Sequence, residues 1–250
     1  MLIAVDIGNS RTVSGQLRGK KVLSRSVIPT RNLKSFSQTK RWAQSLQKAW
    51  KGQDTVVSSV VSGVDLNVKK ALRETFKKKP LFVDVKSDPG LPVHYKKPYE
   101  IGADRVMNAL AAKTLYGAPV IVVDYGTGTT FDVVNKAGDY FGGAILPGLG
   151  ISVRALHEFT AKIPLVKFEK VNFAIGRTTE EAVRSGVYHG AIGTTKELLF
   201  NIRKELKSSA PAIATGGFCQ VFKPTGLFKQ VEPDLTLKGI AAIWRKLNAS

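Results

Sequence analysis

Hydrophobic residues follow two different periods along the first half of the chain. The segment Leu2–Ile7 is a nearly continuous apolar run that leads into Asp6-x-Gly8, which is typical of a buried strand. Further on, Trp42, Leu46 and Trp50 recur every four residues, which is the spacing of one helix face. The same reasoning predicts strands at 2–7, 12–17, 21–28, 55–61 and 81–85 and helices at 36–50, 64–76 and 103–116.

The second half of the chain opens with the same pattern. An apolar run at 119–124 ends at Asp124-x-Gly126, and two segments with strand-like content follow it. We predict strands at 119–124, 129–135, 139–145 and 212–214 and helices at 149–159, 178–200 and 236–247. Because Gly117 stops the preceding helix, we expect an N-terminal domain at 1–117 and a C-terminal domain at 118–250.

The two runs end in related turns, which is the strongest signal in the sequence. Asp6 and Asp124 lie 118 residues apart, and each is followed by a glycine, a turn rich in hydroxyl groups and a second strand. Glycine lets the backbone approach an anion closely, and successive N–H groups of such a turn favour phosphate oxygens. The carboxylate can hold a cation or its water shell beside those phosphates. A single Asp-x-Gly is typical of a plain hairpin turn, but two copies at matching positions favour a phosphate site. Neither the P-loop pattern nor the Rossmann glycine pattern occurs.

Three further motifs are candidates for chemistry, and each also has a structural interpretation. Asp104, in Gly102-Ala-Asp-Arg105, is either a first-turn helix acid or a general base, with Arg105 binding an anion. Thr215-Gly-Gly217 follows a short strand, where paired glycines leave room for a nucleobase or ribose. The glycines of 142–148 favour a packing role.

Net charge, cysteine count and the length of apolar runs limit the classes of protein to which the chain can belong. The 250 residues include 38 Lys and Arg against 19 Asp and Glu, a net charge of +19, with 20 basic and 7 acidic residues in 1–100. The charge is diffuse, so we interpret it mainly as solvated surface and do not expect a nucleic-acid partner. The single cysteine, Cys219, excludes an intramolecular disulfide framework. No apolar run approaches ~20 residues, and the N-terminus lacks a signal-peptide pattern, so we expect a cytoplasmic protein with no membrane partner.

Taken together, these motifs resemble a known family. Two Asp-x-Gly phosphate loops and a Gly-Gly element resemble the actin-like, sugar-kinase and Hsp70-type ATPase superfamily. Within it, Gly102–Arg105, Asp124–Asp132, Gly142–Gly148 and Pro233–Leu237 are similar to type III pantothenate kinases, in the family's order. The resemblance implies an α/β, duplicated, ribonuclease H-like fold, with a mixed sheet in each of two domains and a cleft between them.

The resemblance also implies an activity, namely ATP-dependent phosphorylation of pantothenate to 4'-phosphopantothenate, the first step of coenzyme A synthesis. It further implies a homodimer, with its interface in the C-terminal domain, that uses Mg²⁺ and a monovalent cation such as K⁺ or NH₄⁺. Asp104 would be the general base, Asp124 would bind the monovalent cation, and Asp6 would bind Mg²⁺ through water. ATP would contact Asp6, Ile7, Gly8, Asn9, Ser10, Arg11, Thr12, Val13 and Thr127. Pantothenate would contact Tyr95, Gly102, Ala103, Asp104, Arg105 and, from the partner subunit, Thr179.

The sequence departs from the family pattern at three positions. Ser10 stands where the first loop usually has threonine, Gly128 replaces an alanine in the second loop, and Thr178 replaces an asparagine before Thr179. None of these changes removes a proposed catalytic group. Two other functions stay open at this point, namely another small-molecule kinase of the same fold, and a non-enzymatic regulator whose basic surface binds nucleic acid.

Overall fold

The computed structural model describes residues 1–52, 54–87 and 90–248, which form two compact units. Unit 1 is Met1–Tyr116 together with the chain from Asp234 onward, and unit 2 is Gly117–Pro233. This division differs from the domains expected at 1–117 and 118–250, because the last helix belongs to unit 1. That helix buries its apolar face, which includes Leu237, Ile240 and Ile243, against elements of unit 1.

A five-stranded mixed sheet forms the centre of unit 1. Its strands are β1 (Leu2–Ile7), β2 (Arg11–Arg18), β3 (Lys21–Pro29), β4 (Asp54–Ser59) and β5 (Leu81–Phe82). They lie in the order β3-β2-β1-β4-β5, with β1 antiparallel to β2 and parallel to β4. The strand predicted at 81–85 is shorter than expected, because the carboxylate of Asp84 accepts a hydrogen bond from the Lys86 N–H and turns the chain into η2 (Val85–Ser87).

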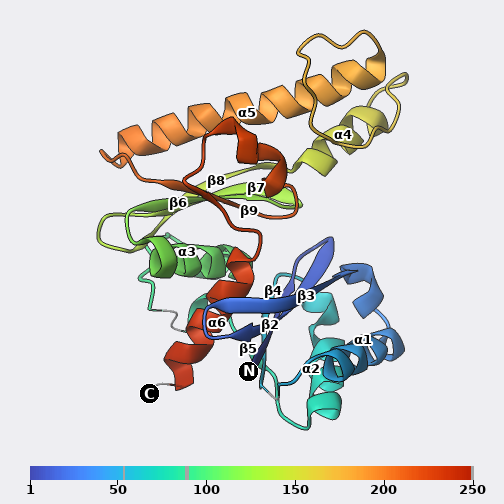
Figure 1. Ribbon diagram of the computed structural model, residues 1–250, viewed down its shortest axis with the longest axis vertical. Helices are drawn as coiled ribbons and strands as arrows, with labels where there is room; N and C mark the ends of the chain where they lie inside the picture. The colour runs from blue at the N-terminus through green and yellow to red at the C-terminus, as the bar shows by residue number, and fades with distance from the viewer. Residues whose placement is uncertain (53, 88–89, 249–250) are drawn as a thin grey trace. The chain divides into compact units, whose positions relative to one another are not determined.

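Helices complete unit 1 (Figure 1). Helices α1 (Phe36–Ala49) and α2 (Ser62–Phe76) pack on one face of the sheet, around a core that includes Ile3, Val5 and Val57. Helices α3 (Ala103–Tyr116) and α6 (Leu235–Asn248) pack against each other and contact β4, and α6 also contacts β1. The two helices approach closely at Gly239, where an added Cβ would lie 2.0 Å from the Met107 carbonyl oxygen. Two short helices, η1 (Thr30–Leu33) and η3 (Pro98–Glu100), lie in the connections.

The sheet of unit 2 repeats the topology of unit 1. Its strands are β6 (Val120–Tyr125), β7 (Gly128–Val134), β8 (Tyr140–Pro147), β9 (Ala212–Thr215) and β10 (Gln230–Val231). They lie in the order β10-β9-β6-β7-β8, with β6 antiparallel to β7 and parallel to β9. β6 therefore corresponds to β1, β7 to β2 and β9 to β4, so the duplication seen in the sequence extends to strand order. The two-residue strand β10 was not predicted.

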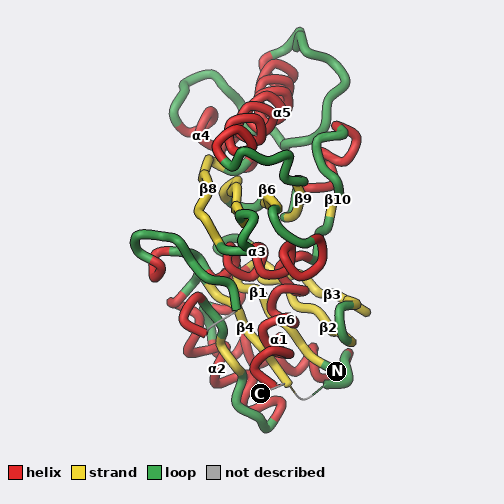
Figure 2. Tube along the Cα trace, turned by 90° about the vertical axis from the view of Figure 1, so that its left-hand side faces the viewer, coloured by secondary structure: helices red, strands yellow, loops and turns green. Residues whose placement is uncertain are grey.

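One long helix covers a face of this second sheet. α5 (Thr179–Glu205) packs over a core that includes Tyr125, Phe131 and Phe222, and α4 (Leu149–Glu158) lies near its N-terminal end (Figure 1). α5 runs five residues past the predicted end at 200, because Ile202 and Leu206 continue its apolar face into the core. Between α4 and α5, residues 159–178 form a loop (Figure 2), and η4 (Cys219–Thr225) follows β9. Among the described residues, no helix is both long and apolar enough to cross a membrane.

Candidate phosphate turns and active site

The first predicted phosphate turn joins β1 to β2 in unit 1. The Gly8 N–H donates to the Arg11 carbonyl oxygen at 3.0 Å, which closes the turn. A Cβ at Gly8 would lie 3.1 Å from that same oxygen, so the position is tight for a larger residue. Asn9, Ser10 and Arg11 are exposed on the turn, as a site for an anionic ligand requires.

Thr30 holds this turn in place, and no pattern in the sequence points to it. Its hydroxyl donates to the Gly8 carbonyl oxygen at 2.7 Å, and its N–H donates to the Ser10 carbonyl oxygen at 3.1 Å. It also lies 3.0 Å from the Thr12 hydroxyl. Thr12, which the family resemblance implies as an ATP contact, is fully buried, and its side chain takes part in the internal structure of the turn.

The second predicted turn joins β6 to β7 in unit 2 and is one residue shorter than the first. Asp6 pairs with Val13 across the first hairpin, whereas Asp124 pairs with Thr130 across the second. The Gly126 N–H donates to the Gly128 carbonyl oxygen at 3.1 Å, and Thr127 is exposed at the tip. Gly148 packs beneath this tip, because an added Cβ would lie 2.0 Å from the Thr127 carbonyl oxygen.

The Gly-Gly element meets the second turn. β9 runs parallel to β6 with Thr215 beside Asp124, so Gly216 follows directly at the same sheet edge. Gly216 has φ +90°, and an added Cβ would lie 2.2 Å from Asp124 Oδ1. The sequence indicated these two motifs separately, and the parallel pairing of β6 and β9 brings them together.

A buried hydroxyl lies beside each of the two aspartates. In unit 1, Ser58 on β4 is the register partner of Asp6, and in unit 2 Thr215 on β9 is the register partner of Asp124. Both side chains are buried, and neither hydroxyl has a hydrogen-bond partner among the described residues. A hydroxyl next to a carboxylate supplies the oxygen atoms that a hard, hydrated cation prefers. The donor set at each position therefore fits a bound cation, although the described chain contains no cluster of three potential metal-ligating His, Cys, Asp or Glu side chains.

Asp104 lies in the first turn of α3, beside the end of β4. A Cβ at Gly102 would lie 2.5 Å from Asp104 Oδ1 and 3.5 Å from Val60 Cγ1. The Val60 N–H in turn donates to the Ile7 carbonyl oxygen at 3.1 Å. Through these contacts unit 1 brings the predicted base close to the strand end that carries Asp6.

The environment of Asp104 suits a proton acceptor. The side chain is half-buried, and Oδ1 accepts a hydrogen bond from the Arg105 N–H at 2.8 Å. Burial raises the pKa of the Asp104 carboxyl above its ordinary value, while the N–H and the positive charge of Arg105 act in the opposite direction. Arg105 itself is buried, with 8% of its surface exposed.

The other predicted pantothenate residues lie in different parts of the chain. Tyr95 is half-buried in the segment before α3, in unit 1. Thr178 caps α5, since its hydroxyl accepts from the Glu181 N–H at 3.2 Å while the Glu181 carboxylate accepts from the Arg177 N–H at 2.8 Å. The cap leaves Thr179 exposed as the first residue of α5, in unit 2.

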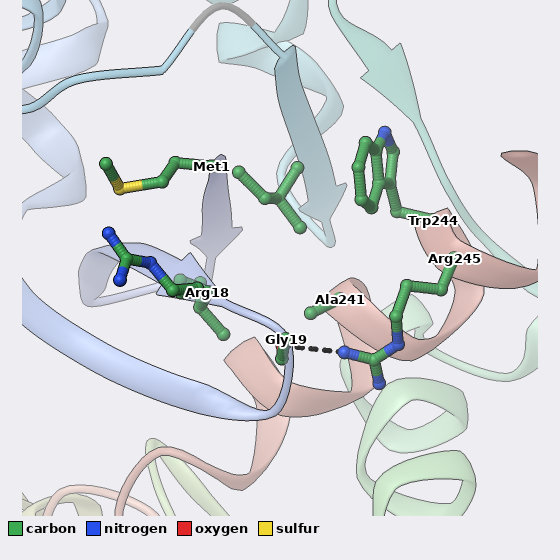
Figure 3. Close-up of a pocket in the computed structure, with 8 residues that line it drawn as sticks. Met1, Arg18, Gly19, Ala241, Trp244 and Arg245 are labelled. Atoms are coloured by element: carbon green, nitrogen blue, oxygen red, sulfur yellow. Dashed lines mark hydrogen bonds between the residues drawn. The ribbon is translucent and has the colours of Figure 1, made fainter.

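A small hollow of about 100 Å³ in unit 1 lies apart from these residues. It is lined by the ends of β1 and β2 and by α6, where Trp244 and Arg245 form one wall (Figure 3). The Arg245 guanidinium donates to the Gly19 carbonyl oxygen at 2.6 Å across it. None of the predicted site residues lines this hollow, so we interpret it as a packing gap between α6 and the β2–β3 turn.

Comparisons with known proteins agree with the motifs. The family model described as type III pantothenate kinase matches residues 2–200. The type III pantothenate kinase of Thermomicrobium roseum is 39% identical, with 100% of this chain and 99% of the relative covered. That of Gluconobacter oxydans is 37% identical, with 96% and 91% covered.

A comparison with solved structures finds chains of the same fold. A solved structure assigned to the Baf family of transcriptional activators, from Campylobacter jejuni, has a TM-score of 0.63 at 16% identity and covers 99% of this chain and 100% of its own. At that identity the likeness shows the fold alone. Sugar-kinase structures share the fold, including one from Cytophaga hutchinsonii with a TM-score of 0.53 at 13% identity, covering 98% of this chain and 99% of its own. The full-length sequence matches, together with the two Asp-x-Gly turns and the Gly102–Arg105 motif, show that the chain belongs to the type III pantothenate kinase family.

Proposed function

We propose that this protein transfers the γ-phosphoryl group of ATP to pantothenate and forms 4'-phosphopantothenate, the first step of coenzyme A synthesis. Its membership of the family carries the proposal, because the match covers both turns and the Asp104 motif. A related kinase for another small molecule is less well supported, since the similarity includes the segment around Asp104 that would select the substrate. The cytoplasm, where ATP is available, is the compartment that this proposal expects.

The first turn is proposed to hold the phosphates of ATP. Its N–H groups and exposed Asn9 and Ser10 side chains offer hydrogen-bond donors, and Arg11 adds a positive charge. Asp6, with the Ser58 hydroxyl beside it in register, is proposed to hold Mg²⁺ through water. Bound Mg²⁺ would neutralise charge on the phosphates, and Thr127 would add a contact from the second turn.

Asp104 is proposed to accept the proton of the pantothenate hydroxyl. Phosphoryl transfer has a loose transition state, so positioning and charge neutralisation dominate and the base has to be close to the hydroxyl. The raised pKa of Asp104 makes its carboxylate a stronger proton acceptor than that of an exposed aspartate. Tyr95, Gly102, Ala103 and Arg105 would position the substrate around it, with Arg105 binding the pantothenate carboxylate.

Asp124 is proposed to bind a monovalent cation such as K⁺ or NH₄⁺. The support is the pairing of its carboxylate with the buried Thr215 hydroxyl and the close packing of Gly216 against its Oδ1 atom. This close packing would restrict the carboxylate to one position, as a selective site requires.

We further propose that the protein acts as a homodimer through unit 2. Large apolar side chains are exposed on its strand β8, on α4 and on the loop that follows, namely Ile145, Ile151, Phe159, Leu165 and Ile175. Exposed apolar residues gathered on neighbouring elements mark protein interfaces. The loop leads directly into α5, so a partner on this surface would lie near Thr179, which fits the proposed contact of Thr179 with the partner's pantothenate.

One assay tests the proposed activity. Purified protein is incubated with ATP, Mg²⁺ and pantothenate, with and without K⁺, while ADP release is coupled to NADH oxidation and product is identified by mass spectrometry. We expect pantothenate-dependent ADP release and a product heavier by one phosphate. Other hydroxy acids serve as matched substrates. No turnover with pantothenate, together with salt-sensitive retention of DNA, would instead support the regulatory alternative.

A further inference from the structure

A second hollow lies in unit 2 along the C-terminal half of α5, and the proposed catalysis does not use it. Its volume is about 730 Å³, within the range of small-molecule sites. It lies toward the end of α5 that is remote from α4 and the 159–178 loop (Figure 1). The lining residues are Lys196, Leu199, Phe200, Arg203, Lys204, Lys207, Ser208, Ser209 and Leu227.

The lining combines positive charge with apolar surface. It contains four cations and no carboxylate, and none of the four forms an ion pair with a carboxylate of the described chain. On α5 the lining residues recur at helical spacing, so they share one face, whereas Glu197 lies on the neighbouring row and is hydrogen-bonded to Asn201 at 2.6 Å. Outside the hollow unit 2 is close to neutral, with 9 basic and 10 acidic residues, so this concentration of charge is local.

Hydrogen bonds fix the backbone and one guanidinium at the rim of the hollow. Arg203 Nε donates to the Ala210 carbonyl oxygen at 3.0 Å, and the Ser208 N–H donates to the Arg203 carbonyl oxygen at 3.1 Å. Lys207 has φ +46°, a left-handed conformation that usually selects glycine at a helix end, and Lys136 Nζ donates to its carbonyl oxygen at 3.1 Å. The guanidinium is therefore held in place, with its terminal nitrogens left for another acceptor.

A helix end attracts cations through its dipole, but that effect does not account for the aromatic ring beside them. Phe200 is 62% exposed and lies one turn before Arg203 and Lys204 on the same face. Leu199 and Leu227 add apolar surface, and Ser208 and Ser209 add hydroxyl groups. The ligand that fits this set has a flat ring and several negative charges.

From these features, we propose that this α5 hollow is a second, non-catalytic binding site for a nucleoside polyphosphate. Its phosphates would contact Arg203, Lys204 and Lys207, and its base would stack on the Phe200 ring. A nucleic-acid strand fits less well, because the hollow offers one exposed aromatic ring and the adjacent row of α5 carries Glu197 and Glu205. The proposal is independent of the catalytic assignment, since none of the predicted site residues lines the hollow.

Photo-crosslinking locates the site. The full-length protein is illuminated with 8-azido-ATP, digested and analysed by mass spectrometry, and binding of ADP is measured by equilibrium dialysis. We expect a saturable label within 196–209 that excess ADP removes. The triple variant Phe200→Ala, Arg203→Gln, Lys207→Gln should weaken that binding about tenfold or more, since it removes the stacking ring and two of the cations proposed to contact the phosphates. Its initial rate with pantothenate at saturating ATP should stay within about twofold of the unmodified protein.

A matched variant controls for charge. Lys162, Lys167 and Lys170 are exposed cations of unit 2 outside the hollow, and their joint change to Gln should leave labelling within 196–209 intact. The proposal is overturned if no label falls within 196–209. It is equally overturned if the triple variant binds ADP at that segment as well as the unmodified protein does. Single-stranded DNA retention that the triple variant loses, without any mononucleotide label, would replace it with a nucleic-acid site.

Discussion

Gly216→Ala is the sharpest test of how the second turn is built. Gly216 has φ +90°, and an added Cβ would lie 2.2 Å from Asp124 Oδ1 and 2.6 Å from the Tyr125 carbonyl carbon. The substitution therefore imposes backbone strain and also displaces the Asp124 carboxylate. Gly226→Ala is a matched control in the same unit, because Gly226 has φ +70° but an added Cβ would meet no atom within 4 Å.

The two variants differ by the cost of the steric contact. A left-handed conformation costs a residue with a Cβ about 1–2 kcal/mol, which both variants share. Inserting a methyl group into a filled site adds about 1–3 kcal/mol for Gly216→Ala. For a chain of this size ~1 kcal/mol corresponds to ~2–4 °C in Tm. We therefore expect Gly226→Ala to lower Tm by about 2–8 °C and Gly216→Ala by a further ~2–12 °C.

Calorimetry measures the loss of Tm, and the K⁺ dependence of the kinase rate measures the displacement of the Asp124 carboxylate. We expect Gly216→Ala to need more K⁺ for half-maximal rate, because the carboxylate that binds the cation has moved, while Gly226→Ala keeps the normal K⁺ requirement. Equal Tm values for the two variants, with an unchanged K⁺ requirement in Gly216→Ala, would refute the packing argument. A lowered Tm without a change in K⁺ requirement would refute only the cation role of Asp124.

The remaining predictions concern Asp104, Asp6 and Asp124. Asp104→Asn should lower turnover by about 10²–10⁴-fold while ADP binding by calorimetry stays normal; near-normal turnover would exclude a general base. Because burial raises the pKa of Asp104, the acidic limb of kcat/KM should lie above the ordinary aspartate value of ~3.9. Folding therefore favours the protonated carboxyl of Asp104. The stability gained in this way is fully present below the ordinary aspartate pKa of ~3.9 and is lost as the pH rises through the raised pKa of the folded protein. At neutral pH, Asp104→Asn should therefore unfold at a temperature equal to or higher than that of the unmodified protein. Asp6→Ala should raise the Mg²⁺ concentration needed for activity and leave pantothenate binding intact, and an unchanged Mg²⁺ titration would remove Asp6 from the metal site. In tris buffer free of K⁺, Na⁺ and NH₄⁺ the enzyme should be nearly inactive, and added K⁺ should restore its activity. The activity of Asp124→Asn should respond only weakly to added K⁺. Full activity without these ions would argue against a cation site.

The elements that carry the candidate site could be predicted from the sequence. Helix α3 was predicted at its observed bounds, and both hairpins with their Asp-x-Gly turns were found, because strand and helix periods are local properties of the chain. The duplication was visible for the same reason, since two segments of similar composition adopt the same strand order. The position of Asp104 in the first turn of α3 could also be predicted, because it follows from where the helix begins.

Tertiary pairing decided the rest. Thr30 and Ser58 become candidate positioning residues only because η1 and β4 lie beside the first turn, since an isolated hydroxyl group carries no period in the sequence. The sequence marked Thr215 only as part of the Gly-Gly element, and the pairing of β9 with β6 brings it beside Asp124. The two-residue strand β10 exists through its pairing with β9. α6 joins unit 1 because its apolar face is buried against α3 and β1, more than 100 residues earlier in the chain. Local sequence specifies which face of a segment is apolar, but long-range burial determines which partner covers it.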